Sequence, residues 1–293
     1  MYRIRRILFL IAISHSTWGQ KLITLSPIQG DNYEMVQQAI DYAIRNPGQS
    51  IAFSPGVYSY SRPLLAISIN GNDYGQVSFS MSGSQSAKNA PDNRLAILTP
   101  TYVNAPALII QKGKGVKIEN IYFKGRYLLP NSIDPYKMQL MRYADWDDHQ
   151  SRQNRYTPYA GAAVDPFSDP GMGFNEQYPG LEKYYLKGMS RGGSTGVDFI
   201  GCRFTNFVVG IIYEPEGQQN GDMCNVIDCS IEYCKVALAW CQDQTKGNQV
   251  ERFRCWGARL PSLIATLLVV ESGRCHLSTE RISQARFTRY LTA

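Results

Sequence analysis

The chain has 293 residues, of which 44% are hydrophobic and 18% are charged, a composition typical of a folded protein rather than a disordered one. Its formal net charge of +6 is small and scattered along the sequence. Because no run of Lys or Arg could follow a phosphate backbone, the charge pattern argues against nucleic acid as a partner.

The N-terminus has the pattern of a secretory signal peptide. Three arginines among the first six residues precede a short apolar run, Ile7–Ile13, and small or polar residues follow as far as Gly19. The run is much shorter than the ~20 residues that cross a bilayer. We expect residues 1–19 to be a signal peptide cleaved before Gln20, and the protein to be secreted, periplasmic or extracellular, with no membrane span. The alternative is a buried N-terminal strand.

An amphipathic helix is the first element predicted after this segment. Apolar residues recur at helical spacing from Met35 to Ile44, and Asp31 or Asn32 is placed to cap the N-terminus. The Asn-Pro-Gly sequence at residues 46–48 ends the pattern. Short β-type runs follow, beginning with residues 50–65.

Similar short apolar phrases then recur at a nearly constant spacing. Cys202, Cys229 and Cys255 each lie in such a phrase and are separated by 27 and 26 residues. A fixed period of short β-runs is the sequence signature of a solenoid whose repeats stack on one another. The aligned positions are Val116 with Val197, Ile118 with Phe199, Ile121 with Cys202, Phe123 with Phe204, Val209 with Val236, Ile211 with Leu238, and Tyr213 with Trp240.

Seven cysteines in an exported chain suggest disulfides, but their spacing suggests otherwise. Cysteines one repeat apart would stack at about 4.8 Å on parallel strands, an orientation that fits the disulfide dihedral poorly. We therefore expect Cys202, Cys229 and Cys255 to form a buried ladder of free thiols, with disulfides as the alternative. No C-x-x-C pair is present, so we expect no zinc site.

The repeat is interrupted between about residues 126 and 193 by a stretch rich in aromatic residues, Asp, Pro and Gly. Insertions this long are uncommon unless they are functional, and aromatic and carboxylate side chains suit sugar binding. The densest candidate site there consists of Trp146, Asp147, Asp148, His149, Tyr156, Tyr159 and Asp165, with Asp147 and Asp148 as catalytic carboxylates. The alternative is a self-packed surface flap whose tyrosines form a small core.

A second candidate pair lies on the repeats. Glu216 and Asp243 are separated by 27 residues, and each follows a predicted strand that ends in an aromatic residue. Carboxyls on adjacent coils are placed to share a proton or a calcium ion, and paired carboxyls cleave glycosidic bonds. Both are therefore candidate catalytic residues, and the alternative is a solvated turn.

Two further features contain basic residues. Asp228 and Arg254, separated by 26 residues, are expected to be neighbours on adjacent coils. They would form a surface ion pair, with Arg254 as the candidate substrate-binding arginine of a lyase. Residues 112–115 (Lys-Gly-Lys-Gly) are a β-turn, with a site for acidic glycans as the second interpretation.

The last part of the chain, residues 258–293, lacks the turns and the β alternation of the repeats and any recognisable closing element. A solenoid needs a cap over the open edge of its last coil. We therefore expect this segment to be truncated or altered by a reading-frame error.

The segment from Gly30 to Leu65 resembles the N-terminal part of the pectate-lyase-like, right-handed parallel β-helix superfamily. There a Gly-Asp turn leads into a capping helix, a strand and a Pro-Gly-x-Tyr turn, here residues 55–58. The phrases at 115–125, 196–207 and 224–234 resemble its coils. The resemblance implies an all-β fold, a right-handed parallel β-helix over residues 20–257, with an N-terminal capping helix and the insertion at about 126–193.

The superfamily includes pectate and pectin lyases, polygalacturonase-like hydrolases and phage tailspikes, so the fold alone does not assign an activity. The motif set of the hydrolases is not matched here, and neither is the aspartate cluster of the calcium-dependent lyases. We expect a secreted protein that binds or cleaves a polysaccharide, as a lyase or glycoside hydrolase, with Ca²⁺ as the candidate cofactor. The alternatives are a non-catalytic glycan-binding adhesin of the tailspike type and an inactive fragment.

Overall fold

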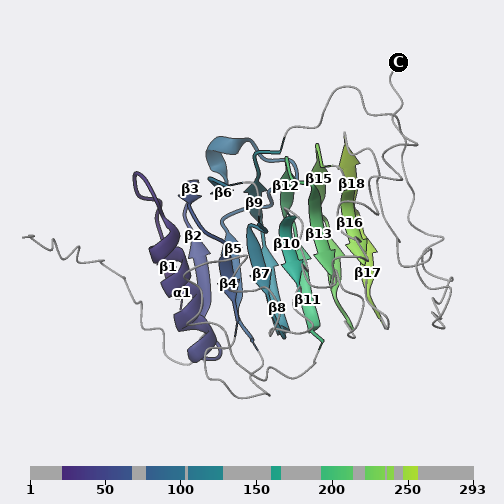
Figure 1. Cartoon of the computed structure of the whole chain (residues 1–293), viewed down its shortest axis with the longest axis horizontal. Helices are drawn as coiled ribbons and strands as arrows, with labels where there is room; N and C mark the ends of the chain where they lie inside the picture. Colours follow the sequence, from purple (N-terminus) through teal and green to yellow (C-terminus); the bar gives the residue numbers. More distant parts are fainter. Residues whose placement is uncertain are drawn as a thin grey trace, which may run out of the picture.

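The computed structural model describes residues 22–67, 77–102, 105–127, 160–165, 193–213, 222–234, 236–240 and 247–256. In these residues the chain forms one α-helix, one 3-10 helix and eighteen strands arranged in three all-parallel sheets. The strands of successive coils lie side by side in chain order, from purple to yellow-green (Figure 1). The arrangement is consistent with the parallel β-helix that the resemblance implies.

Each sheet takes one strand from each successive coil. Sheet A consists of β1 (Leu22–Leu25), β2 (Ser50–Phe53), β5 (Ser80–Gly83), β8 (Lys114–Glu119), β11 (Thr195–Ile200), β14 (Asn225–Ile227) and β17 (Gln249–Glu251). Sheet B consists of β3 (Gly56–Tyr60), β6 (Ala96–Pro100), β9 (Ile121–Lys124), β12 (Arg203–Thr205), β15 (Ser230–Glu232) and β18 (Arg254–Trp256). Sheet C consists of β4 (Leu64–Ala66), β7 (Leu108–Ile110), β10 (Ala160–Val164), β13 (Val209–Tyr213) and β16 (Val236–Trp240).

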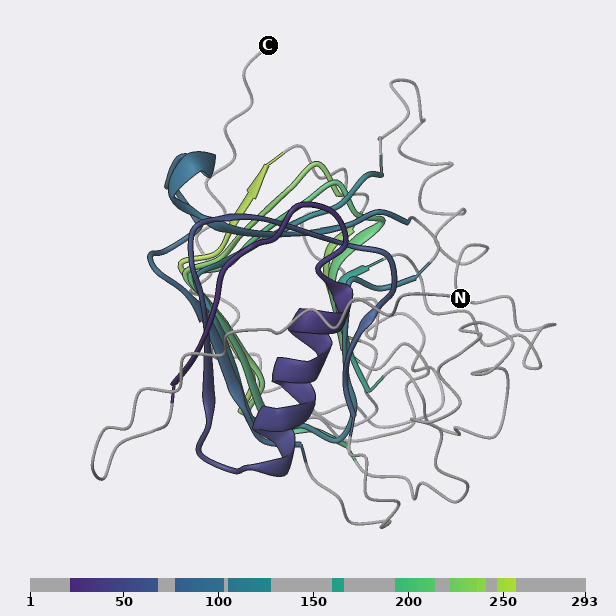
Figure 2. The ribbon, with the colours of Figure 1, turned by 90° about the vertical axis from the view of Figure 1, so that its left-hand side faces the viewer.

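Viewed from the N-terminal end, the three sheets stand as three sides around a common interior (Figure 2). Alternate residues point inward along each strand, and inward residues of all three sheets belong to one buried cluster, among them Ile118, Phe123 and Ile110. Rings stack along the coils as well: those of Phe123 and Phe204 lie 4.9 Å apart and within 5° of parallel.

The helix α1 (Tyr33–Arg45) confirms the first predicted element and lies across the first coil in Figure 2. Asp31, one of the two predicted caps, accepts the N–H of Tyr33 at 2.9 Å. The other predicted cap, Asn32, makes no capping bond; its side chain is used by the preceding loop, including a bond from Ile28 N–H at 2.8 Å.

One side chain of α1 completes the hydrogen bonds of a strand. The amide of Gln37 donates to the carbonyl of Leu65 and accepts the N–H of Leu65, both at 2.8 Å. Leu65 lies in β4, the first strand of sheet C. Gln37, which is 2% exposed, therefore occupies the place that a preceding strand would take.

In the coils from β8 onward, sheets A and B are joined by a bend of one residue in the left-handed region. The bend residues have φ between 47° and 63° and are Asn120, Gly201, Asp228 and Arg252. The N–H groups of the first three still bond to the next coil, as from Gly201 to the carbonyl of Ile227 at 2.9 Å. A glycine suits this bend because an added Cβ at residue 201 would lie 2.4 Å from Oδ1 of Asn120, so the Asn120 side chain would have to move.

The predicted register is confirmed over most of the coils. Val116, Ile118 and Phe123 pair with the expected residues of β11 and β12, and β13 pairs with β16 as expected. The last coil is a correction: Cys255 pairs with Ile231, not Cys229, and Arg254 pairs with Ser230. The offset there is 24 residues, because the connection before β17 is shorter.

The cysteine expectation is correspondingly confirmed in part. Cys202, Cys224, Cys229, Cys234 and Cys255 are not in disulfides; the first four are buried and Cys255 is half-buried. Cys255 does not extend the column of Cys202 and Cys229. Burial raises the pKa of the Cys224 and Cys234 thiols to about 12, so both stay protonated at neutral pH.

The expected interruption at 126–193 contains a regular strand. β10 pairs with β7 on one side and β13 on the other, so residues 160–164 continue sheet C. Its residues, AGAAV, are mostly small because little room is left beside Phe204. A Cβ on Gly161 would lie 2.4 Å from Cδ1 of that ring. The predicted signal peptide and the segment 258–293 lie outside the described residues.

Candidate functional site

The outward face of sheet B carries two columns of side chains that we call the sheet B strip. Because the core-facing residues of β12 and β15 are Phe204 and Ile231, their neighbours in sequence point outward. The register of the strands places the residues of each column beside one another on successive coils. The first column is Tyr122, Arg203, Ser230 and Arg254, and the second is Lys124, Thr205, Glu232 and Trp256.

Arg203 organises the middle of the strip. Its guanidinium lies 4.7 Å from the centroid of the Tyr122 ring and bonds to the carboxylate of Glu232 at 3.0 Å. A second carboxylate, that of Asp92, lies 3.5 Å away. Tyr122 OH and Thr205 Oγ1 form a further hydrogen bond of 2.9 Å. These contacts hold a planar cation and two acids in fixed positions on the outward face of the sheet, where the side chains of Arg203 and Glu232 are only 22% and 9% exposed.

The end of the strip at β18 is open to solvent. Trp256 is 47% exposed, and the guanidinium of Arg254 lies 5.6 Å from the centroid of its ring. Arg254 also donates to Oδ1 of Asn89 at 3.3 Å. An exposed aromatic face beside an arginine offers both a stacking surface and directional donors to a ligand.

Arg254 is the predicted site residue that the structure places on this surface. The expected Asp228–Arg254 neighbour pair is wrong, because the last coil has the shorter offset. Asp228 pairs instead with Lys88 at 2.7 Å and with Arg252 at 3.7 Å. Arg254 therefore faces Trp256 and Asn89 and is available to a ligand in a way that an ion-paired arginine would not be.

Asp165, another predicted site residue, is fully buried at the end of β10. Its carboxylate accepts the N–H of Lys112 at 2.7 Å and the N–H of Ser194 at 2.6 Å. Burial raises its pKa and these hydrogen bonds lower it, and the balance leaves the pKa at about 6. The contacts that the structure shows for Asp165 thus join residues on either side of β10, and its contact with substrate stays a prediction.

The remaining predicted site residues lie outside the described residues: Trp146, Asp147, Asp148, His149, Tyr156, Tyr159, Glu216 and Asp243. Their roles stay predictions, and so does a calcium ion held by the carboxylates. Among the described residues, no group of three or more His, Cys, Asp or Glu is placed to hold a metal ion. Within the same residues, no helix is long and apolar enough to cross a membrane.

A carboxyl that was not predicted from the sequence lies on the outward face of sheet A. Asp198 of β11 stands between Lys117 and Asn225 on neighbouring strands. The half-buried position raises its pKa, and the Asn225 amide, which donates to it at 2.7 Å, works in the opposite direction. Asp198 is part of the phrase VDFIGC, so its outward position could have been predicted from the alternation of Val197 and Phe199.

The sheet B strip, unlike Asp198, could not have been predicted from the alternation within one strand. Its residues come from four separate coils, and the two long-range contacts at Arg254 and Asp228 come from residues 88 and 89, far earlier in the chain. No spacing in the sequence relates the β5–β6 connection to β18. Besides Arg254, which was predicted, only Trp256 carried a signal in the sequence, as an aromatic residue two positions later and therefore on the same face of the strand.

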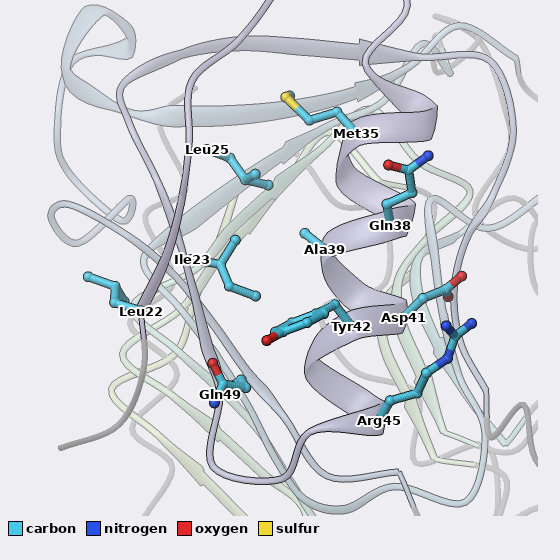
Figure 3. Close-up of a pocket in the computed structure, with 10 residues that line it drawn as sticks. All are labelled: Leu22, Ile23, Leu25, Met35, Gln38, Ala39, Asp41, Tyr42, Arg45 and Gln49. Atoms are coloured by element: carbon cyan, nitrogen blue, oxygen red, sulfur yellow. The ribbon is translucent and has the colours of Figure 1, made fainter. Parts of the chain in front are cut away.

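A pocket of about 330 Å³ lies between α1 and β1. In Figure 3, Tyr42 reaches from the helix toward β1, whereas the carboxylate of Asp41 points away from that strand. The lining residues are Leu22, Ile23, Leu25, Met35, Gln38, Ala39, Asp41, Tyr42, Arg45 and Gln49. The apolar walls, without converging polar groups, do not suit a sugar, and we assign the pocket no function.

Comparison with known proteins adds little to this geometry. No family model matches the chain, and no curated protein matches it. A solved structure described as that of the Streptococcus pneumoniae surface protein and adhesin PfbA is 10% identical, with 81% of this chain and 90% of that chain covered. Its TM-score is 0.22, which is too low to bear on the fold or the function of this chain.

Proposed function

We propose that this chain is an extracellular parallel β-helix protein that binds a polysaccharide along the sheet B strip. The observation that carries the proposal is Trp256, an exposed indole with the Arg254 guanidinium 5.6 Å from its ring centroid. Sugar rings stack on such flat faces, and their hydroxyls bond to guanidinium and carboxylate groups. Glu232 and Arg203 carry such groups on the neighbouring coils, where they bond to each other and their side chains are 9% and 22% exposed.

The repeat of the strip supports a polymeric ligand. Its four strands, β9, β12, β15 and β18, are adjacent in sheet B. At about 4.8 Å between parallel strands, their outward side chains span roughly 14 Å. Arg254 and Trp256 are exposed, whereas Thr205, Ser230 and Glu232 are buried. Solenoids use such extended surfaces to bind extended partners.

The fold details and the location belong to the same proposal. A right-handed coil closed at its N-terminal end by α1 is supported by the bonds of Gln37 to Leu65, which satisfy the first strand of sheet C. An extracellular location is supported by the signal-peptide pattern of residues 1–19.

Cleavage of the bound polysaccharide is the second candidate function. Asp198, whose pKa is raised by burial, is the described carboxyl that favours it, because a general acid needs a raised pKa. The other catalytic candidates are those of the sequence, namely Asp147, Asp148, Glu216 and Asp243, with or without Ca²⁺. Without turnover, the protein is a glycan-binding adhesin.

The test is retention on a panel of immobilised neutral and acidic polysaccharides. We expect Trp256→Ala to weaken binding to a retained polysaccharide by about 10-fold or more, the usual effect of removing a stacking aromatic. Tyr42→Ala removes an aromatic of similar exposure on α1 and is the matched control. Equal binding by both variants would place the site elsewhere, and a folded protein that no polysaccharide retains would refute the proposal.

Turnover is measured on the same panel, with calcium and with chelator, as reducing ends or unsaturated uronides. Product lost in Asp147→Ala and Asp148→Ala would assign cleavage to the insertion. Product lost in Glu216→Ala and Asp243→Ala would assign it to the coils, and loss in Asp198→Asn to sheet A. If the protein binds a polysaccharide but releases no product, the glycan-binding adhesin is the function that remains.

A further inference from the structure

Most of the connection between β5 and β6, namely residues 84–94, runs along the outside of the molecule beside the sheet B strip, and we call this segment the strap. The N–H of Ala87 donates to the carbonyl of Gly201 at 2.7 Å. Lys88 forms its 2.7 Å ion pair with Asp228 and also donates to the carbonyl of Arg252. One residue later, Asn89 accepts the hydrogen bond from Arg254.

Most of these anchors are polar and lie at the surface. Ala87 is the only buried residue of the strap, where it packs in a small cluster with Leu95, Ile97 and Tyr122. The side chains of the Lys88–Asp228 pair are 16% and 40% exposed. A segment with one small buried side chain and exposed polar anchors is the kind that opens locally at low cost in free energy.

Two polar atoms of the strip lie between the places where the strap is anchored. Ala87 belongs to the same buried cluster as Tyr122, at one end of the first column, and Asn89 contacts Arg254 at the other. Between them stand Arg203 and Ser230, which are register neighbours. Asp92, also in the strap, pairs with the Arg203 guanidinium at 3.5 Å. Nε of Arg203 and Oγ of Ser230 are buried and have no hydrogen-bond partner among the described residues.

Buried donors without partners are rare in native proteins and point to a group that completes them. We infer that the strap is a latch, held by Lys88 on Asp228, that closes over a subsite in which Arg203 and Ser230 donate to one acceptor oxygen of the bound polysaccharide. The inference rests on the proposed function of the strip. It adds that ligand enters the open form of the strap, so opening and binding are linked.

The opening of the strap is measured first, without ligand. Lys88→Ala and Asp228→Asn each remove the ion pair, and we expect hydrogen exchange in a peptide covering residues 84–94 to quicken by about threefold or more. Lys117→Ala is the matched control, since it removes the 2.8 Å pair with Glu119 on sheet A. Unchanged exchange in both latch variants would overturn the latch.

Binding to the retained polysaccharide is measured next. Both latch variants should bind the polysaccharide more tightly. The affinity should rise by the same factor as the fraction of molecules with an open strap, until the open form predominates. The two substitutions change the net charge in opposite directions, so a simple charge effect would strengthen one and weaken the other. Opposite or absent effects, in a protein whose strap does open, would overturn the link between strap and ligand.

Ser230→Ala tests the subsite itself. It removes a hydroxyl without a partner, so the melting temperature should stay the same or rise, while binding weakens severalfold in both the native and the Lys88→Ala background. Unchanged binding would exclude Ser230 from the subsite. If exchange quickens as expected but no polysaccharide is retained by any variant, the proposed function fails together with the ligand role of the subsite, and the opening of the strap stands as measured.

Discussion

At the scale of single residues, burial decides what a carboxylate does in this protein. Asp165 and Asp228 both follow a strand and both adopt positive φ. Asp165 is fully buried and bonded to two backbone N–H groups, whereas the Asp228 side chain is 40% exposed and paired with Lys88. The sequence shows the two residues in similar settings, so it could not tell an interior carboxyl from a surface one.

The pKa of Asp165 gives a prediction with an unusual sign. Because its folded pKa, about 6, lies above its ordinary value of 3.8, the folded state binds the proton more tightly than the unfolded state does. The contribution of Asp165 to stability is therefore greatest below about pH 4 and falls as pH rises to about 6, by up to about 3 kcal/mol. It is constant above that pH.

Urea unfolding at pH 4.5 and pH 7 checks this expectation for the native protein and Asp165→Asn. The variant does not titrate, so the native protein should lose stability relative to it between the two pH values. Glu34→Gln, at an exposed position in the first turn of α1, is the control: it keeps Asp165 and should lose stability between the two pH values as the native protein does. A native protein that gains stability over Asp165→Asn at pH 7 would show that the backbone bonds outweigh burial.

At the scale of elements, the strands in which apolar residues alternate regularly were predicted from the sequence, and the strand without this alternation was not. The alternation of apolar residues fixed β8, β11 and their register at Val116 and Val197. The strand β10 was missed because AGAAV has no alternation, the space beside Phe204 admitting only small residues. The predicted alignment of the last coil was wrong by two residues. A shift of two residues leaves the same side chains facing inward, so the apolar pattern does not distinguish the two alignments.

The contact of α1 with sheet C is an element-scale feature with a clear test. Gln37→Leu keeps the volume of the side chain but leaves the N–H and C=O of Leu65 without their bonds. Each unpaired buried group costs about 1–3 kcal/mol, so for the two groups we expect the free energy of unfolding to fall by about 2–6 kcal/mol.

The neighbouring Gln38 provides the control, because it is exposed and the same substitution there should change stability by no more than about 0.5 kcal/mol. Urea unfolding of the three proteins checks this. Equal stability of Gln37→Leu and the native protein would mean that water replaces the amide at the first strand of sheet C.

At the scale of the whole molecule, each coil touches its neighbours, and the sequence period was sufficient to predict this stacking. Period and alternation foretold the parallel sheets, since they record what each strand buries against the next. They could not foretell the sheet B strip, which depends on how the β5–β6 connection crosses several coils.

Stacking predicts that damage spreads only to adjacent coils. Val197→Ala in β11 should quicken hydrogen exchange in both β8 and β14, the strands on either side. The same change at Val250 in β17 should quicken exchange in β14 and leave β8 as it was. Mass spectrometry of the corresponding peptides checks both variants. Equal effects of Val250→Ala on β8 and β14 would show that the coils open as one unit.

The strap sets an order of events during synthesis. Stacked coils form contacts between residues about one coil apart, so each coil is able to form as soon as it leaves the ribosome. The bond from Lys88 to Asp228 joins residues 140 positions apart and must wait for three further strands of sheet A and three of sheet B. The strap is therefore completed late, and until Asp228 and Arg254 have been made, the face of Arg203 is without its cover.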